Sequence, residues 1–221
     1  MGQLIDHILQ ERARTIAAVD ATAGAAPPRL RTYLVWSFWV GVAFFTIYPT
    51  MNWLTSLRAR PWHLYLPAEL RIPFLPQFVW VYFSMYLLFF LPAFVLPAER
   101  MPALGKQLIA GSLVAAAIFV LVPAELGFAR HLPGRAPYDA IFAGVFRVDR
   151  PYNLVPSLHV IFSASIALAC AGAMRRPAAR VALLAWLAVI VASTILVHQH
   201  HLIDVAAALA IVLVLRRGFD A

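Results

Sequence analysis

The chain has 221 residues, of which 62% are hydrophobic and 13% charged, and its mean hydropathy is +0.79. This composition excludes an ordinary soluble globular domain and predicts a single polytopic membrane domain. The formal net charge of +8 comes almost wholly from arginine, and we expect it to set membrane topology and contact anionic headgroups rather than nucleic acid.

Residues 1–32 are predicted to form a cytoplasmic segment that precedes the membrane domain. Within 4–17, five apolar residues recur at helical spacing: Leu4, Ile5, Ile8, Leu9 and Ile16. Their common face predicts an amphipathic helix on the membrane surface. A short solvated helix with no functional role explains the same pattern. Residues 33–217 are then predicted to form the six-span membrane domain.

Six apolar stretches predict an all-α bundle of six transmembrane helices. They lie at about 33–51, 78–96, 107–123, 158–174, 179–197 and 202–215. The inner side of this arrangement holds 11 of the Arg and Lys residues and the outer side holds 7. By the positive-inside rule both termini lie in the cytoplasm. The protein is therefore expected in the plasma (inner) membrane, with the loops at 52–77 and 124–157 facing the outer, periplasmic side.

Two polar stretches flank the spans at 158–174 and 179–197. The first ends in Pro156-Ser157-Leu158-His159, and the second runs from His198 to Asp204. Because the chain crosses the membrane, turns and crosses back, both polar ends return to the same face. Histidines that are distant in sequence are thus predicted to meet at one depth.

Asp204 lies well inside a predicted span, where an ionisable group is costly unless it is paired or hydrated. His200 precedes it by four residues and His201 by three, so on a helix both rings can face the carboxylate. A carboxylate that accepts one imidazole N–H leaves the other nitrogen free to attack an electrophile. This is the logic of a catalytic triad applied to a histidine nucleophile. Helical spacing does not choose between His200 and His201.

His159 is predicted to lie on the same face, where it can protonate a leaving oxygen. Ser157 opens the helix that carries it, and free amides at a helix start attract anions. Arg150 and the nearby Arg147 are candidates for binding a phosphate group. Together these residues predict a site for phosphoryl transfer.

Simpler interpretations exist for each residue alone. A single histidine at the end of a span is commonly an interfacial anchor, and arginines in a loop are commonly only loop charges. Ser157 after Pro156 also fits a structural helix cap. His198, His200 and His201 with His159 can be read as a metal site, but no cysteine or second carboxylate joins them, so we expect no metal and no other cofactor. His198 is expected to line the pocket or to have no role.

Pro156-Ser157-Leu158-His159 and Ser193…His200-x3-Asp204 resemble the second and third signatures of the type-2 phosphatidic acid phosphatase superfamily, over roughly 124–215. The resemblance implies six spans and makes His200 the nucleophile that forms a phosphohistidine. It makes His159 the acid and base, and Ser157 a phosphate-binding residue.

Two positions depart from that pattern. Ala143 stands where the first signature has lysine, although Arg150-Pro151 matches its end, and Thr194 stands where the third signature has arginine. The sequence after Ser193 and the loop at 72–76 look closer to the branch that contains inositol phosphorylceramide synthases, whose members transfer a headgroup phosphate to an alcohol.

The expected function is a membrane lipid-phosphate phosphatase that works without metal through a phosphohistidine. The first alternative is a headgroup phosphotransferase of the same fold. The second is a non-catalytic lipid-binding or transport protein that uses the Asp204–histidine pair as a proton relay. The expected partners are a lipid phosphate and the bilayer, while the identity of the lipid and the oligomeric state are not specified by the sequence.

Overall fold

A computed structural model describes residue 11 and residues 29–57, 61–149 and 151–219. Every regular element in these ranges is a helix. The longer helices are α2 (Arg29–Ser56), α3 (Val79–Val95), α4 (Met101–Leu121), α5 (Tyr138–Val148), α6 (Leu158–Ala173), α7 (Pro177–Leu196) and α8 (Leu202–Phe219). Three short 3₁₀ helices are η1 (Pro67–Arg71), η2 (Pro76–Phe78) and η3 (Ala98–Arg100). The predicted all-α class is confirmed.

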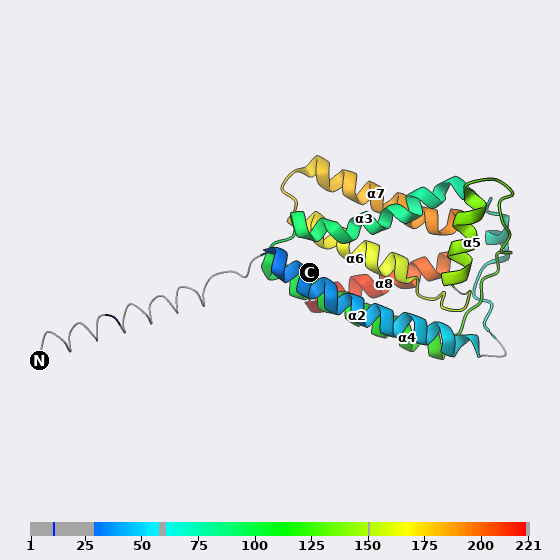
Figure 1. The fold of residues 1–221 in the computed structure, drawn as a ribbon, viewed down its shortest axis with the longest axis horizontal. Helices are drawn as coiled ribbons and strands as arrows, with labels where there is room; N and C mark the ends of the chain where they lie inside the picture. Colours follow the sequence, from blue (N-terminus) through cyan, green and yellow to red (C-terminus); the bar gives the residue numbers. More distant parts are fainter. Residues whose placement is uncertain (1–10, 12–28, 58–60, 150, 220–221) are drawn as a thin grey trace, which may run out of the picture.

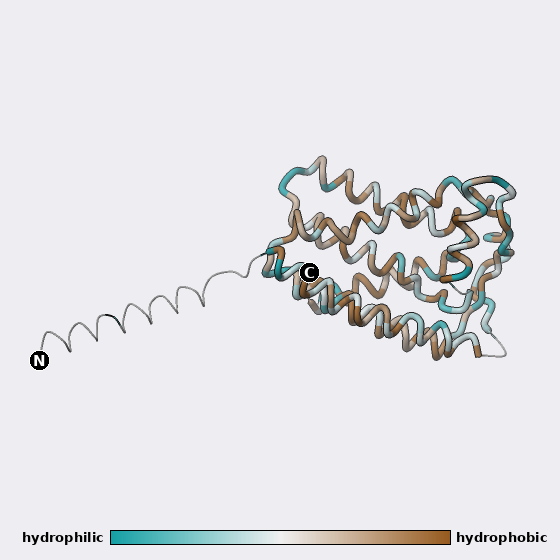
Figure 2. Tube along the Cα trace, viewed as in Figure 1, coloured by the Kyte–Doolittle hydropathy of each residue, from teal (hydrophilic) through white to brown (hydrophobic). Residues whose placement is uncertain are grey.

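Helix α5 lies across one end of the bundle, and the other long helices run roughly along its long axis (Figure 1). Helix α6 occupies the middle, where it packs against α3, α4, α7 and α8. Twelve of its 16 residues are buried, because its small side chains allow its neighbours to approach closely. The hydrophobic residues follow the helices, and the polar residues gather in the connections at the two ends (Figure 2).

Among the residues that the structure describes, four helical segments are long and apolar enough to cross a membrane: Arg29–Ser56, Pro76–Val95, Ala98–Leu121 and Pro177–Leu196. Membrane character is thus supported, but six crossings are not established. Helix α6 is apolar and has 16 residues, which at about 1.5 Å each give a rod shorter than a typical hydrocarbon core of about 30 Å. Helix α8 has 18 residues but carries a buried carboxylate in its first turn and two arginines in its last.

The predicted boundaries shift at the N-terminal end and in the loops predicted to face the outer side. Helix α2 begins at Arg29, inside the segment predicted as 1–32, and it continues to Ser56. The amphipathic helix predicted at 4–17 lies outside the described residues apart from residue 11. The stretch 124–157, predicted as a loop, contains α5. Its apolar face packs under α3, with Phe142 fully buried, and this periodic pattern was present in the sequence.

The loops at the site end are joined by backbone hydrogen bonds. Trp62 N–H donates to the Pro123 carbonyl at 2.7 Å, and Glu125 N–H donates to the Trp62 carbonyl at 3.1 Å. Farther along, Leu75 N–H donates to the Leu196 carbonyl at 2.9 Å. The connection after α2 is therefore fastened to the ends of both α4 and α7.

Close packing of α2 on α4 depends on a glycine, which gives a first prediction. A Cβ at Gly105 would lie 2.3 Å from Cε3 and 2.8 Å from Cδ2 of Trp36. Gly105→Val should therefore lower the free energy of unfolding by about 1–3 kcal/mol through overpacking, as measured by thermal unfolding in detergent micelles. Gly41→Ala is the control, because a Cβ there has nothing within 4 Å. Equal melting temperatures for Gly105→Val and the wild type would contradict the packing.

Candidate functional site

The site forms where the turn between α7 and α8 meets the start of α6. The Thr194 carbonyl accepts the N–H groups of Gln199 at 3.0 Å and His200 at 3.1 Å, which folds the chain back sharply after α7. His198 in this turn has φ 55°, in the left-handed region that non-glycine residues seldom occupy. The turn thus holds the following histidines against the end of the bundle.

His200 and Asp204 form a buried pair. His200 Nδ1 lies 3.1 Å from Asp204 Oδ2, and the two residues are 3% and 1% exposed. The same oxygen accepts the His201 N–H at 2.8 Å. Asp204 therefore contacts the ring of His200 but only the backbone of His201, which resolves the ambiguity that helical spacing had left.

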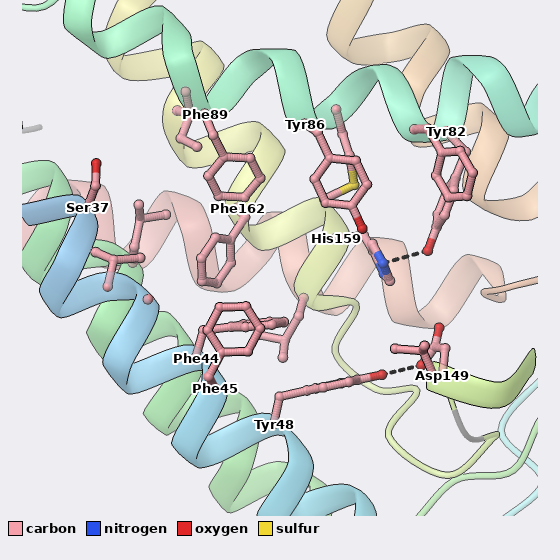
Figure 3. Close-up of a pocket in the computed structure, with 18 of the residues that line it drawn as sticks. Ser37, Phe44, Phe45, Tyr48, Tyr82, Tyr86, Phe89, Asp149, His159 and Phe162 are labelled. Atoms are coloured by element: carbon pink, nitrogen blue, oxygen red, sulfur yellow. Dashed lines mark hydrogen bonds between the residues drawn. The ribbon is translucent and has the colours of Figure 1, made fainter. Parts of the chain in front are cut away.

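His159 continues this chain of contacts from α6. Its Nδ1 lies 3.1 Å from His200 Nε2, so the two histidines that are 41 residues apart meet as the hairpin argument predicts. Its Nε2 lies 2.5 Å from the hydroxyl oxygen of Tyr82 on α3. The two side chains point toward one another in Figure 3. Asp204, His200, His159 and Tyr82 thus form one continuous line of polar contacts.

Ser157 lies beside the pair as the N-cap of α6. Its hydroxyl accepts the Val160 N–H at 3.3 Å, and its own N–H donates to the Asp204 backbone carbonyl at 3.1 Å. Ser157 is fully buried. It ties the start of α6 to the start of α8, and both its hydroxyl and its amide are engaged within the protein.

The predicted phosphate-binding arginines are not brought to this pair by the described structure. Arg147 is exposed at the end of α5, and Arg150 lies outside the described residues. Ala143, at the position of the first signature's lysine, is half-buried on α5. Thr194, at the position of the third signature's arginine, is buried and shapes the turn as described above.

Arg130 lies near the site and was not predicted from the sequence to belong to it. Its Nη1 donates to the Asp149 carbonyl at 2.6 Å, and its guanidinium lies 5.0 Å above the Phe146 ring. Burial lowers the pKa of Arg130, while negative charge on Asp149, and on Tyr48 and Tyr82 when they ionise, acts in the opposite direction. Arg130 is thus close enough to influence charge at the polar end of the site.

His201 belongs to a second buried pair, with Glu69 of η1. Glu69 Oε2 lies 3.1 Å from His201 Nδ1 and accepts the Leu202 N–H at 2.8 Å. Its Oε1 accepts the Leu66 N–H at 2.9 Å. On the other side of the ring, His201 Nε2 accepts the Gly127 N–H at 3.0 Å. The His201–Glu69 clasp joins the loop after α2 and the loop after α4 to the start of α8.

The shifted pKa values of Glu69 and His201 favour an ionised carboxylate and a neutral imidazole in this clasp. Burial alone would raise the pKa of Glu69, but the two backbone N–H donors and His201 outweigh it and lower that pKa. Burial lowers the pKa of His201 despite the nearby Asp204 and Glu69 carboxylates. A neutral ring is also what the geometry requires, because a protonated Nε2 would face the Gly127 N–H.

His198 has a structural position. Its Nε2 lies 2.9 Å from the Ile72 carbonyl and so must carry a proton to donate there. Its ring stacks on Phe128 at a centroid distance of 3.9 Å, and Phe128 stacks in turn on His201 at 4.5 Å. His198 therefore helps to fix the loops after α2 and α4. Within the described ranges no group of three or more His, Cys, Asp or Glu side chains could hold a metal ion.

A large apolar cavity leads to His159. It has a volume of about 1020 Å³ and lies among α2, α3, α4, α5 and α6. Phe44, Phe45, Phe89 and Phe162 line its body, as Figure 3 shows. Its polar end is lined by Tyr48, Asn52, Tyr82, Asp149 and His159. The Tyr48 hydroxyl donates to the Asp149 carboxylate there.

The neutral state of His201 predicts acid sensitivity. A histidine whose pKa is lower in the folded protein takes up its proton mainly on unfolding, so the free energy of unfolding should fall as the pH drops below about 6.5. For each proton taken up on unfolding, the free energy of unfolding can fall by at most about 1.4 kcal/mol per pH unit. Burial lowers the pKa of His198 in the same direction. Melting temperatures between pH 7.5 and 5.5 should therefore fall, and less so in His201→Gln. An equal slope in that variant would contradict the assignment.

Comparison with protein-family models, with curated proteins and with solved structures gave no match to this chain.

Proposed function

We propose that this protein catalyses metal-independent phosphoryl transfer on a lipid phosphoester through a phosphohistidine at His200. One observation carries the proposal: His200 holds its Nδ1 on a buried carboxylate and directs its Nε2 toward a second histidine at the polar end of an apolar cavity. Asp204 fixes the tautomer of the nucleophile and stabilises positive charge on the ring as phosphorus is attacked. His159 protonates the leaving oxygen and later accepts a proton from the attacking hydroxyl.

The cavity supports a lipid substrate. Its lining is almost wholly apolar and aromatic, and polar side chains converge at the end where His159 lies. Phe45 on α2 and Tyr86 on α3 line the cavity and are 75% and 53% exposed, which supports a sideways opening between these helices. In a bilayer this opening admits an apolar chain from the side while the phosphate reaches His159.

We further propose that α2, α3, α4, α6, α7 and α8 all cross the plasma membrane. Both termini then lie in the cytoplasm and the site lies on the outer side. The bias of Arg and Lys toward the inner connections supports this orientation. Helix α6 is shielded from lipid by its neighbours, so its short length is tolerated at the centre of the bundle. The carboxylate of α8 lies at its outer end in the pair with His200.

Water is our first candidate for the acceptor of the phosphoryl group, which makes the enzyme a lipid-phosphate phosphatase. Resemblance to the type-2 phosphatidic acid phosphatase superfamily at Pro156–His159 and His200–Asp204 supports this chemistry. Transfer to an alcohol is the second candidate, favoured by Ala143 and Thr194, which replace two cations of the phosphatase signatures. Arg150 and Arg147 remain candidates for phosphate binding.

The test is an assay in detergent micelles with EDTA, in which phosphatidate, prenyl phosphates and intact phospholipids are offered in turn. Free phosphate and lipid products are followed together, with and without an added alcohol. Free phosphate would establish the phosphatase, and a new phosphodiester that requires the alcohol would establish the transferase. Neither product from any of these lipids would contradict the proposal and favour the alternative of a non-catalytic proton relay, which does not need His159.

A further inference from the structure

Proton positions along the line from Asp204 to Tyr82 follow from the contacts. An ionised carboxylate only accepts hydrogen bonds, so His200 Nδ1 carries a proton and donates to Asp204 Oδ2. In a neutral ring the other nitrogen is then an acceptor, so His200 Nε2 accepts from His159 Nδ1–H. By the same rule His159 Nε2 is an acceptor, and it is the Tyr82 hydroxyl that donates to it.

Tyr82 therefore contacts His159 on the side of the ring that faces away from His200. The His159 Nδ1–H points toward the reacting nitrogen of His200, while His159 Nε2 receives the phenol proton at a donor–acceptor distance of 2.5 Å. Tyr82 is 3% exposed, lines the cavity, and packs its ring on that of His159 at a centroid distance of 4.9 Å. A neutral imidazole is by itself a weak acid. A phenol that donates a proton to one ring nitrogen makes the imidazole a stronger acid at its other nitrogen.

We propose that Tyr82 is a positioning residue that fixes the tautomer of His159 and supplies it with a proton as the leaving group departs. This inference rests on the proposed function and adds a residue that lies in none of the three signatures. The phosphate enters between the two histidine rings, and His159 Nδ1–H passes from His200 Nε2 to the leaving oxygen.

The atoms and charges balance over the two steps. His200 Nε2 bonds to phosphorus as the P–O bond breaks; the His159 Nδ1 proton moves to the leaving oxygen, and the Tyr82 proton moves to His159 Nε2. The products are an alcohol, phosphohistidine, neutral His159 and a Tyr82 phenolate. Water or an alcohol then attacks phosphorus and gives a proton to His159 Nδ1, and His159 Nε2–H returns a proton to Tyr82.

Substrates with different leaving groups test the relay. Dodecyl phosphate must expel an alkoxide, which needs a proton. A nitrophenyl phosphate monoester whose ring carries a dodecyl chain instead expels a stable phenolate, which does not. Tyr82→Phe should lower kcat on dodecyl phosphate by about 100-fold and change kcat on the nitrophenyl substrate by less than about 3-fold. Tyr138→Phe on α5, outside the cavity, is the control and should leave both rates at the wild-type level. A merely structural role for Tyr82 would lower both rates together.

Equal losses on both substrates, or no loss on either, would overturn the role of Tyr82 while leaving the proposed function intact. A wild-type protein that is inactive on both substrates would overturn the proposed function and the relay with it. If Tyr82→Phe does not fold, the relay is tested by measuring the rate of the wild-type protein in mixtures of H₂O and D₂O. Two protons in motion predict a curved dependence on the deuterium fraction with dodecyl phosphate, and a straight line would overturn the relay.

Discussion

Replacement of His200 with alanine should lower the rate of phosphoryl transfer by about 1000-fold or more, because the nucleophile is lost and no second nitrogen can take its place. His201 cannot substitute, since its two ring nitrogens are engaged by Glu69 and by the Gly127 N–H. The direct measurement is a label transferred from a ³²P-lipid phosphate to the protein. The label should be stable in alkali and labile in acid, as phosphohistidine is, and it should be absent from His200→Ala.

The control is His63→Ala, which removes an exposed histidine that pairs with Glu125 in the loop after α2. That variant should label and turn over like the wild type. His200→Ala leaves the buried Asp204 carboxylate without its ring partner, so its melting temperature should fall, and its activity is compared with that of the wild type at a temperature at which both proteins are folded. Turnover undiminished in His200→Ala would rule out the assigned nucleophile for hydrolysis and for transfer to an alcohol.

The helices and the central pair were accessible from the sequence because they depend on local periodicity. Apolar runs predicted the long helices, and the spacing of His200 and Asp204 predicted their contact. The meeting of His159 with His200 required only that two helices form an antiparallel hairpin. Local sequence did not resolve the end points, so α2 begins before the predicted span and α5 emerges within a predicted loop.

Contacts that depend on tertiary packing were not accessible. Tyr82 lies 77 residues from His159 and Glu69 lies 132 residues from His201, and no periodic pattern links either pair. Arg130 was one of several loop arginines, and only the fold brings it to Asp149 rather than leaving it exposed like Arg147. Helical spacing left both His200 and His201 open as the ring partner of Asp204, and in the structure the distant Glu69 engages the ring that Asp204 does not.

Removal of Glu69 should have the largest effect on stability. Glu69→Ala leaves the Leu66 and Leu202 N–H groups and His201 Nδ1 without their acceptor in a buried site. Breaking a buried pair in this way costs about 3–5 kcal/mol. Because the Leu202 N–H opens the helix that carries Asp204, we also expect kcat to fall in the fraction that remains folded.

A matched control exists in the same loops. His63 and Glu125 form a His–Glu pair at 2.9 Å, but their side chains are 67% and 33% exposed, and such surface pairs contribute about 0–1 kcal/mol. Glu125→Ala should therefore melt close to the wild type, whereas Glu69→Ala should melt many degrees lower in the same micelles. Equal melting temperatures for the two variants would show that the His201–Glu69 clasp does not hold the loops after α2 and α4 to α8. In that case the position of His200 would rest on the turn at Thr194 and on Asp204 alone.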